Sequence, residues 1–173
     1  MNLNCKGKLI DLRTPKVMGI LNLTPDSFYD GGRYKEESAV LTQVERMCAA
    51  GATFIDMGAY SSRPGAASVT ETEELKRLLP LLEVVVKNFP EVLISIDTFR
   101  SKVAAECLER GAALINDISA GALDSNMLAT VAQYQAPYIA MHMKGTPQTM
   151  QGEAVYEDLI REMRYYFSKK ITI

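Results

Sequence analysis

Five polar residues stand at or near the carboxyl ends of short apolar segments: Asn22, Asp56, Asp97, Asn116 and His142. An amide such as that of Asn22 can coordinate a hard cation or bind a phosphate oxygen. Asn116 offers both a donor and an acceptor, which complement the amide edge of a base-like ring. A carboxylate that closes an apolar strand, as Asp97 does, is costly unless it meets a cation or the N–H groups of a heterocycle. Taken alone, these residue types support no more than an enzyme that binds a phosphate-bearing ligand.

Two segments rich in turn and hydroxyl residues follow the first two apolar segments. In residues 21–32 (LNLTPDSFYDGG), Phe28 lies in a glycine-flanked loop, where aromatic side chains often cover ligands. In residues 56–65 (DMGAYSSRPG), two serines, the second of them Ser62, precede Arg63, whose planar guanidinium can bind phosphate oxygens bidentately. A plain turn and a solvated loop with a surface arginine fit the same residues when each segment is taken alone.

The last apolar segment ends in Met141 and His142. Met141 is unbranched and polarizable, which suits contact with a flat ring. A lone histidine is more often a hydrogen-bonded structural residue than a ligand, so His142 is interpreted as structural. Asp117 is also interpreted as structural, and Thr98 is suited to cap the helix that follows it.

The elements that position these residues repeat one theme: a short apolar run, a polar loop and an amphipathic helix. Continuous apolar runs are typical of parallel strands buried on both faces. The expected strands are Lys16–Leu23, Thr53–Met57, Val92–Asp97, Ala113–Asn116 and Pro137–His142. The expected helices are Glu36–Ala50, Val69–Asn88, Arg100–Arg110, Ser125–Gln135 and Val155 onward.

Several residues mark the expected helix ends. Gly51 and Gly111 follow two of the helices, as left-handed caps commonly do. Ser101 and Ser125 are expected to begin the third and fourth helices. Pro80 lies inside the second helix pattern and is expected to kink or interrupt that helix.

Five successive strand–helix units predict right-handed βαβ crossovers, for which two architectures compete: an open doubly wound sheet and a closed TIM barrel. Polar residues at five strand ends favour the barrel, where those ends converge on one face, because an open sheet uses mainly the ends near its switch point. The predicted fold class is therefore α/β, a TIM (β/α)₈ barrel. A complete barrel typically needs about 250 residues and eight units.

The chain has 173 residues and about five βα units, so the expectation is an incomplete barrel. One domain is expected over residues 1–173, truncated so that the C-terminal βα units are absent. The last helix pattern runs out at KKITI without a Gly, Asn or Pro stop signal. Such an arc leaves two strand edges unpaired and one face of the core open, so it is not expected to fold well alone.

Composition restricts the class of partner. The chain is 47% hydrophobic and 23% charged with a formal net charge of −2, so neither nucleic acid nor an anionic membrane is an expected partner. Its three cysteines lack CxxC spacing and are expected to be reduced and structural. The N-terminal sequence lacks the apolar core of a signal peptide, and no apolar run approaches about 18 residues, so the expected location is the cytoplasm.

Taken together and in order, five blocks resemble the successive signature blocks of the dihydropteroate synthase family: NLTPDSFYDGG, DMGAYSSRPGA, SIDTFRSKVA, INDISAG and MHMKGTPQTMQ. The resemblance covers Lys16 to at least Gln151. The first block is highly specific, whereas other pterin-binding barrels share the third and fourth in looser form. The resemblance implies a TIM barrel and a homodimer that condenses 6-hydroxymethyl-7,8-dihydropterin diphosphate with p-aminobenzoate, releasing pyrophosphate. It also implies Mg²⁺ as cofactor and sulfonamides as competitors of p-aminobenzoate.

The resemblance implies roles for residues at the anionic end of the substrate. Asn22 is expected to contact the Mg²⁺–pyrophosphate unit. Ser62 and Arg63 are expected to hold the pyrophosphate, and Arg63 to stabilise its developing charge. Ser62 stands where the family usually has Thr, and it keeps the hydroxyl. Phe28 and Pro64 are expected to close around p-aminobenzoate.

At the ring end, Asp97 and Asn116 are expected to hydrogen-bond the pterin, while Ile118 and Met141 line its slot. Asp97 is also expected to support positive charge at the methylene carbon.

The family's later blocks are absent from this sequence, so activity is expected only of an intact enzyme. Two alternatives are a non-catalytic pterin-binding paralogue and the pterin-binding domain of a methyltransferase. The methyltransferase domain has no use for the pyrophosphate-type elements.

Overall fold

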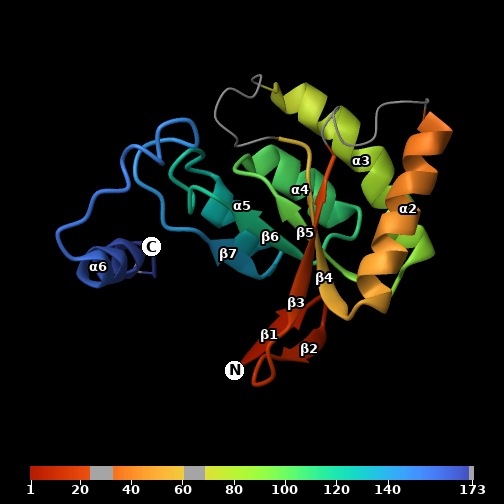
Figure 1. Cartoon of the computed structure of the whole chain (residues 1–173), viewed down its shortest axis with the longest axis horizontal. Coiled ribbons are helices and arrows are strands. Elements are labelled where there is room, and N and C mark those ends of the chain that lie inside the picture. The colour runs from red at the N-terminus through yellow and green to blue at the C-terminus, as the bar shows by residue number, and fades with distance from the viewer. Residues whose placement is uncertain (24–32, 61–68, 172–173) are drawn as a thin grey trace.

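The computed structural model describes residues 1–23, 33–60 and 69–171. Five parallel strands form one sheet in chain order (Figure 1). They are β3 (Val17–Asn22), β4 (Ala52–Gly58), β5 (Leu93–Asp97), β6 (Leu114–Asp117) and β7 (Tyr138–Ala140). The helices are α2 (Arg33–Ala49), α3 (Glu71–Asn88), α4 (Ser101–Glu109), α5 (Met127–Gln133) and α6 (Leu159–Ile171).

The order of the strands decides between the two architectures. A doubly wound sheet reverses its strand order at a switch point. Here each strand pairs with the next one along the chain, from β3 to β7, without a reversal. This is the order in one continuous arc of a (β/α) barrel. The predicted α/β class and incomplete barrel are confirmed.

The sheet has one apolar and one mixed face, which follow from its register. Ile55, Ile94 and Ile115 lie on the face that packs against the helices and are almost fully buried. The opposite face, here called the inner face, carries Asp56, whose register partner is Ser95. At its edges this face also carries exposed apolar groups, such as Ile20, which is 65% exposed. The open face expected of an incomplete barrel is therefore present.

An antiparallel hairpin of β1 (Asn2–Cys5) and β2 (Lys8–Asp11) precedes the sheet. Lys6 and Gly7 join its strands with φ angles of 53° and 80°, the combination of a type I′ turn. The apolar side of the hairpin packs on residues near the amino ends of the sheet strands, among them Phe54 and Leu93. No element is predicted for this segment from the sequence. It covers the end of the sheet opposite to the polar strand ends.

The helix signals are only partly confirmed. Gly51 and Gly111 adopt φ angles of 98° and 100°, and α4 begins at Ser101 as predicted. The start of α5 is predicted wrongly, since it begins at Met127 and not at Ser125. The predicted interruption at Pro80 does not occur either, because α3 continues from Glu71 to Asn88. Burial of leucines on both sides of this proline stabilises the helix across the missing N–H group.

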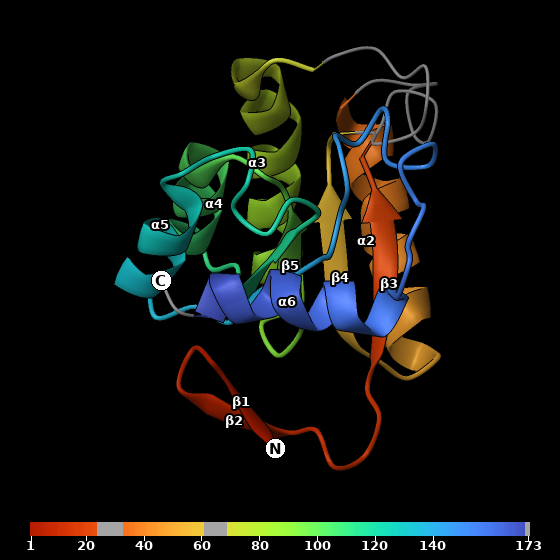
Figure 2. The same cartoon turned by 90° about the vertical axis from the view of Figure 1, so that its left-hand side faces the viewer.

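Helix α6 lies on the other side of the sheet from α2 and α3 (Figures 1 and 2). The hydroxyl of Tyr166 on α6 donates to the carbonyl of Ser119, 3.1 Å away. None of the described helices is both long and apolar enough to cross a membrane. All three cysteines belong to the described residues and are free thiols, as predicted.

Candidate functional site

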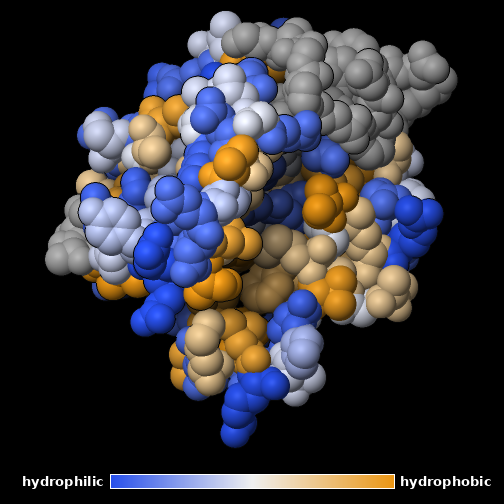
Figure 3. Space-filling model, turned by 60° about the vertical axis from the view of Figure 1, so that its left-hand side comes forward, coloured by the Kyte–Doolittle hydropathy of each residue, from blue (hydrophilic) through white to orange (hydrophobic). Residues whose placement is uncertain are grey.

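Polar residues from three neighbouring strands meet at the carboxyl end of the inner face. Asp97 on β5 is the register partner of Asn116 on β6. Asn116 Nδ2 donates to Asp56 Oδ2 on β4 at 2.9 Å, across the strand that lies between them. Figure 3 shows a hollow on one side of the molecule, in which hydrophilic residues lie next to hydrophobic ones. Asp56, Asp97 and Asn116 are thus brought together, although Asp56 and Asn116 are 60 positions apart in the sequence.

Asp97 is held in a poorly solvated and negative environment. Burial and, to a smaller extent, the charges of Asp56, Glu74 and Asp117 together raise the pKa of its carboxyl to about 7. Gly58 provides the space for this side chain, because a Cβ there would lie 3.1 Å from the Asp97 Cβ. A carboxylate in such a place gains most from a ligand that donates hydrogen bonds to it.

Replacement of Gly58 by Ala is expected to displace Asp97. The added Cβ would also lie 3.3 Å from Asp97 Oδ2, which is tighter than ordinary contact. We expect a loss of about 1–2 kcal/mol in the free energy of unfolding, together with weaker ligand binding. Gly152→Ala is the control, because its nearest neighbour atom is 3.5 Å away. Equal unfolding curves for the two variants in urea would contradict the expected displacement.

Asp117 has the structural role that its sequence position suggested. It accepts hydrogen bonds from the backbone N–H and hydroxyl of Ser119, at 2.7 and 2.8 Å, and from the Gly121 N–H at 2.8 Å. The hydroxyl of Tyr138 donates to it at 2.6 Å. Burial, and then this hydrogen bond, raise the pKa of the Tyr138 phenol. With four donors satisfied, this carboxylate fixes the loop after β6.

A second buried network, centred on Glu74 of α3, is missed by the sequence analysis. Glu74 is 1% exposed, forms an ion pair with Arg100 and accepts a hydrogen bond from Thr98 Oγ1 at 2.7 Å. One feature of the sequence could have indicated the network: Glu74 precedes Leu78 by four residues, so its carboxylate lies on the apolar side of the helix. The Thr98 hydroxyl also accepts the Arg100 N–H at 3.2 Å. The predicted capping of α4 by Thr98 is wrong, because the N-cap residue is Arg100, whose side chain forms no capping hydrogen bond.

Arg100 contacts residues on both sides of segment 61–68. Its guanidinium donates to the carbonyl of Val69 at 2.7 Å and lies 5.4 Å from the ring centroid of Tyr60. The Tyr60 hydroxyl accepts a hydrogen bond of 3.0 Å from Gln148, in the loop after β7. These contacts hold Tyr60 and Val69, the described residues on either side of the segment.

The remaining predicted ring contacts lie at the ends of β6 and β7. Ile118 is half-buried, and Met141 is 37% exposed, with its N–H bonded to the Asp117 carbonyl at 3.1 Å. His142 packs against aromatic rings of the C-terminal segment, including Tyr166 at 4.8 Å in an edge-to-face contact. This packing agrees with the structural interpretation of His142.

Asn22 is exposed at the carboxyl end of β3, where its register partner is Gly58. One strand, β4, therefore lies between Asn22 and the strand end that carries Asp97. Among the described residues no group of three His, Cys, Asp or Glu side chains could hold a metal ion. An amide oxygen at this place fits Mg²⁺ as a single protein ligand, since Mg²⁺ usually keeps several waters and binds substrate phosphates. Phe28, Ser62, Arg63 and Pro64 lie outside the described residues.

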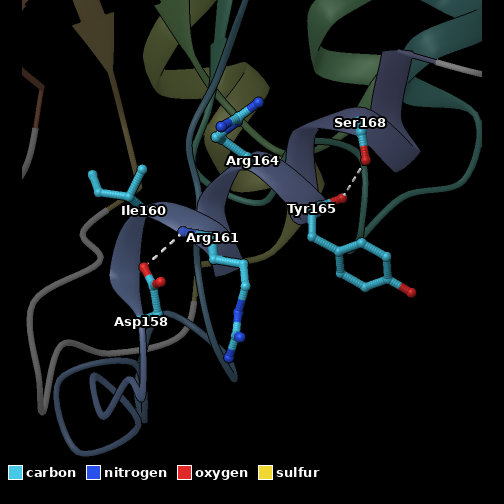
Figure 4. A pocket seen from close by; sticks show the side chains of 6 residues that line it. All are labelled: Asp158, Ile160, Arg161, Arg164, Tyr165 and Ser168. Atoms are coloured by element: carbon cyan, nitrogen blue, oxygen red, sulfur yellow. Dashed lines mark hydrogen bonds between the residues drawn. The ribbon is translucent and has the colours of Figure 1, made fainter.

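A further hollow, shown in Figure 4, lies on α6 and is separate from the strand-end site. It is lined by Asp158, Ile160, Arg161, Arg164, Tyr165 and Ser168. The two hydrogen bonds drawn there, from Arg161 N–H to Asp158 and from Ser168 to the Tyr165 carbonyl, are local to this helix. A groove formed by one helix offers no convergent polar groups from several elements, so it is not the functional site.

Comparison with known proteins shows the family of the chain. Residues 18–173 match the family model described as "Pterin binding enzyme". The chain belongs to the pterin-binding enzyme family. Within this family it is 43% identical to the dihydropteroate synthase of Escherichia coli K12 over 99% of the chain and 60% of that protein.

Two solved structures of pterin-binding enzymes are also similar. One is Yersinia pestis dihydropteroate synthase in complex with a sulfonamide drug, at a TM-score of 0.88 and 42% identity over 99% of this chain and 62% of that one. The other is Xanthomonas albilineans dihydropteroate synthase with 4-aminobenzoic acid, at a TM-score of 0.86 and 35% identity over 99% and 60%. The chain thus spans about three-fifths of the length of these relatives.

Proposed function

We propose that this protein acts as a dihydropteroate synthase, which joins 6-hydroxymethyl-7,8-dihydropterin diphosphate to p-aminobenzoate in folate biosynthesis. The observation that carries the proposal is the pairing of Asp97 with Asn116 at the carboxyl end of the inner face. A half-buried carboxylate beside an amide complements the donor and acceptor groups of a pterin edge. The names of the relatives, and the 4-aminobenzoic acid named with one of them, support the same substrates.

The chemistry is a displacement at the methylene carbon of the pterin. The amino nitrogen of p-aminobenzoate attacks this carbon, the C–O bond to the diphosphate breaks, and the nitrogen loses a proton to water. Asp97, near the ring, stabilises positive charge that develops as the bond breaks. The aromatic amine is neutral near pH 7 and needs positioning more than deprotonation.

The anionic leaving group requires positive charge on the opposite side of the carbon. Arg63 and Ser62 would bind the diphosphate, and Asn22 would contact the Mg²⁺ that accompanies it. When bound, Mg²⁺ would neutralise part of the charge of the departing diphosphate. Phe28 and Pro64 would enclose p-aminobenzoate. We also propose that the active protein is a cytoplasmic homodimer.

Calorimetric titration separates the two ends of the substrate. Arg63→Ala is expected to weaken binding of the pterin diphosphate about tenfold or more and to reduce the effect of Mg²⁺, because a charge-assisted contact is lost. The same variant should bind the pterin without its diphosphate as the wild type does. Arg13→Ala removes an exposed arginine of the N-terminal segment and is the control.

The decisive activity is pyrophosphate release that depends on p-aminobenzoate, measured on the protein in its natural length. Equal wild-type affinity for the pterin with and without its diphosphate would refute the pyrophosphate role. Ring binding without this release would indicate a non-catalytic pterin-binding protein.

A further inference from the structure

The least explained polar group of the site is the carboxylate of Asp56. It is 6% exposed, and its Oδ2 accepts the 2.9 Å hydrogen bond from Asn116. Among the described residues, its Oδ1 has no hydrogen-bond partner, and neither has the hydroxyl of its fully buried register partner Ser95. Buried polar atoms of this kind are rare in native proteins and require an explanation. Both are on the inner face, on the side where Asp97 lies.

The bond from Asn116 to Asp56 determines how the amide is presented. An ionised carboxylate only accepts hydrogen bonds, so the nitrogen of Asn116 must face Asp56. The amide oxygen and the second N–H then remain for a ligand. Without a partner, the Asn116 amide could turn either its nitrogen or its oxygen toward the ligand. The sequence alone does not distinguish these two orientations. Asp56 removes this ambiguity.

We propose that Asp56 is a positioning residue, which orients the Asn116 amide so that it recognises the pterin edge in one orientation only. This inference rests on the proposed function, since the ligand is a pterin in both. Asp56 acts through Asn116 and forms no bond to the reacting atoms. The amide oxygen of Asn116 can then accept from a ring N–H, and its second N–H can donate to an adjacent ring nitrogen.

A double-mutant cycle tests whether Asp56 acts through Asn116. The variants are Asp56→Asn, Asn116→Ala and the double variant, titrated with 6-hydroxymethyl-7,8-dihydropterin. Asp56→Asn should weaken binding about tenfold when Asn116 is present, because its own amide lets Asn116 turn over, and less than about twofold in the Asn116→Ala background. Equal losses in both backgrounds would overturn the proposal. Asp56→Ala replaces Asp56→Asn in the cycle if the asparagine variant does not fold.

The pH profile of binding tests the premise that Asp56 carries a charge, which the orientation of Asn116 requires. Asp97 accepts hydrogen bonds from the ring more strongly when it is ionised, so binding is expected to strengthen as pH rises. The charged groups around Asp97 are Asp56 on β4, Asp117 on β6 and Glu74 on α3, the last paired with Arg100. Loss of the Asp56 charge should move the midpoint of this profile to lower pH. An unchanged midpoint would count against the proposal.

Asp11→Asn is the matched control, because it removes the same charge from an exposed pair with Arg13 on the hairpin. It should change neither affinity nor midpoint. If the wild type does not bind the pterin at all, the proposed function fails. If the wild type binds but the cycle is additive, only the role of Asp56 fails.

Discussion

Asp97→Asn is expected to make the protein more stable at pH 8 and to remove most of its affinity for the pterin. Burial, together with the neighbouring carboxylates, raises the pKa of this carboxyl from 3.8 to about 7 in the folded state. Between these values the folded state binds a proton that the unfolded state releases. The contribution of Asp97 to stability is therefore fully present below pH 3.8 and is lost as pH rises through about 7.

The size of the effect follows from the difference between the two pKa values. A shift of this size corresponds to roughly 4 kcal/mol as an upper limit between acidic and alkaline pH. The Asn side chain does not titrate, so the variant should lack this part of the pH dependence. Ring binding should weaken about tenfold or more, since a charge-assisted acceptor is lost.

Urea unfolding of wild type and Asp97→Asn at pH 5.5 and pH 8 measures the effect. The advantage of the variant should be larger at pH 8. Asp11→Asn is the control, since the adjacent Arg13 guanidinium lowers the pKa of the Asp11 carboxyl instead. Parallel pH dependences of wild type and Asp97→Asn would contradict the expectation. A group that weakens the fold at working pH and remains in place is typical of a binding site.

Glu74→Ala should cause the largest loss of stability. The substitution leaves the Arg100 guanidinium, 19% exposed, without its carboxylate and removes the acceptor of the Thr98 hydroxyl. Breaking a buried ion pair by removing one partner typically costs about 3–5 kcal/mol. The carbonyl of Val69 remains a partner of Arg100, which does not compensate for the lost charge.

Glu83→Ala on the same helix is the matched control. Glu83 is 60% exposed and pairs with Arg110, so its removal should cost less than about 1 kcal/mol. Thermal and urea unfolding of both variants give the comparison. Similar losses of stability for Glu74→Ala and Glu83→Ala would show that the buried ion pair contributes no more to stability than the exposed one.

The alternation of strands and helices follows from the sequence alone, because strand and helix periodicities are local properties. The strand predicted at Val92–Asp97 is found at Leu93–Asp97, and the placement of polar residues at strand ends is confirmed for Asn22, Asp97 and Asn116. The roles of Arg63 and Phe28 stay predictions, since both residues lie outside the described part of the chain.

The tertiary structure alone decides which polar groups meet. The bond between Asp56 and Asn116 depends on the register of three strands, and the pair of Glu74 and Arg100 on how α3 packs beside the end of β5. The continuity of α3 through Pro80 likewise depends on packing against the sheet. The two contacts join elements that are far apart in the chain, and the continuity of α3 depends on burial. Local sequence patterns encode neither.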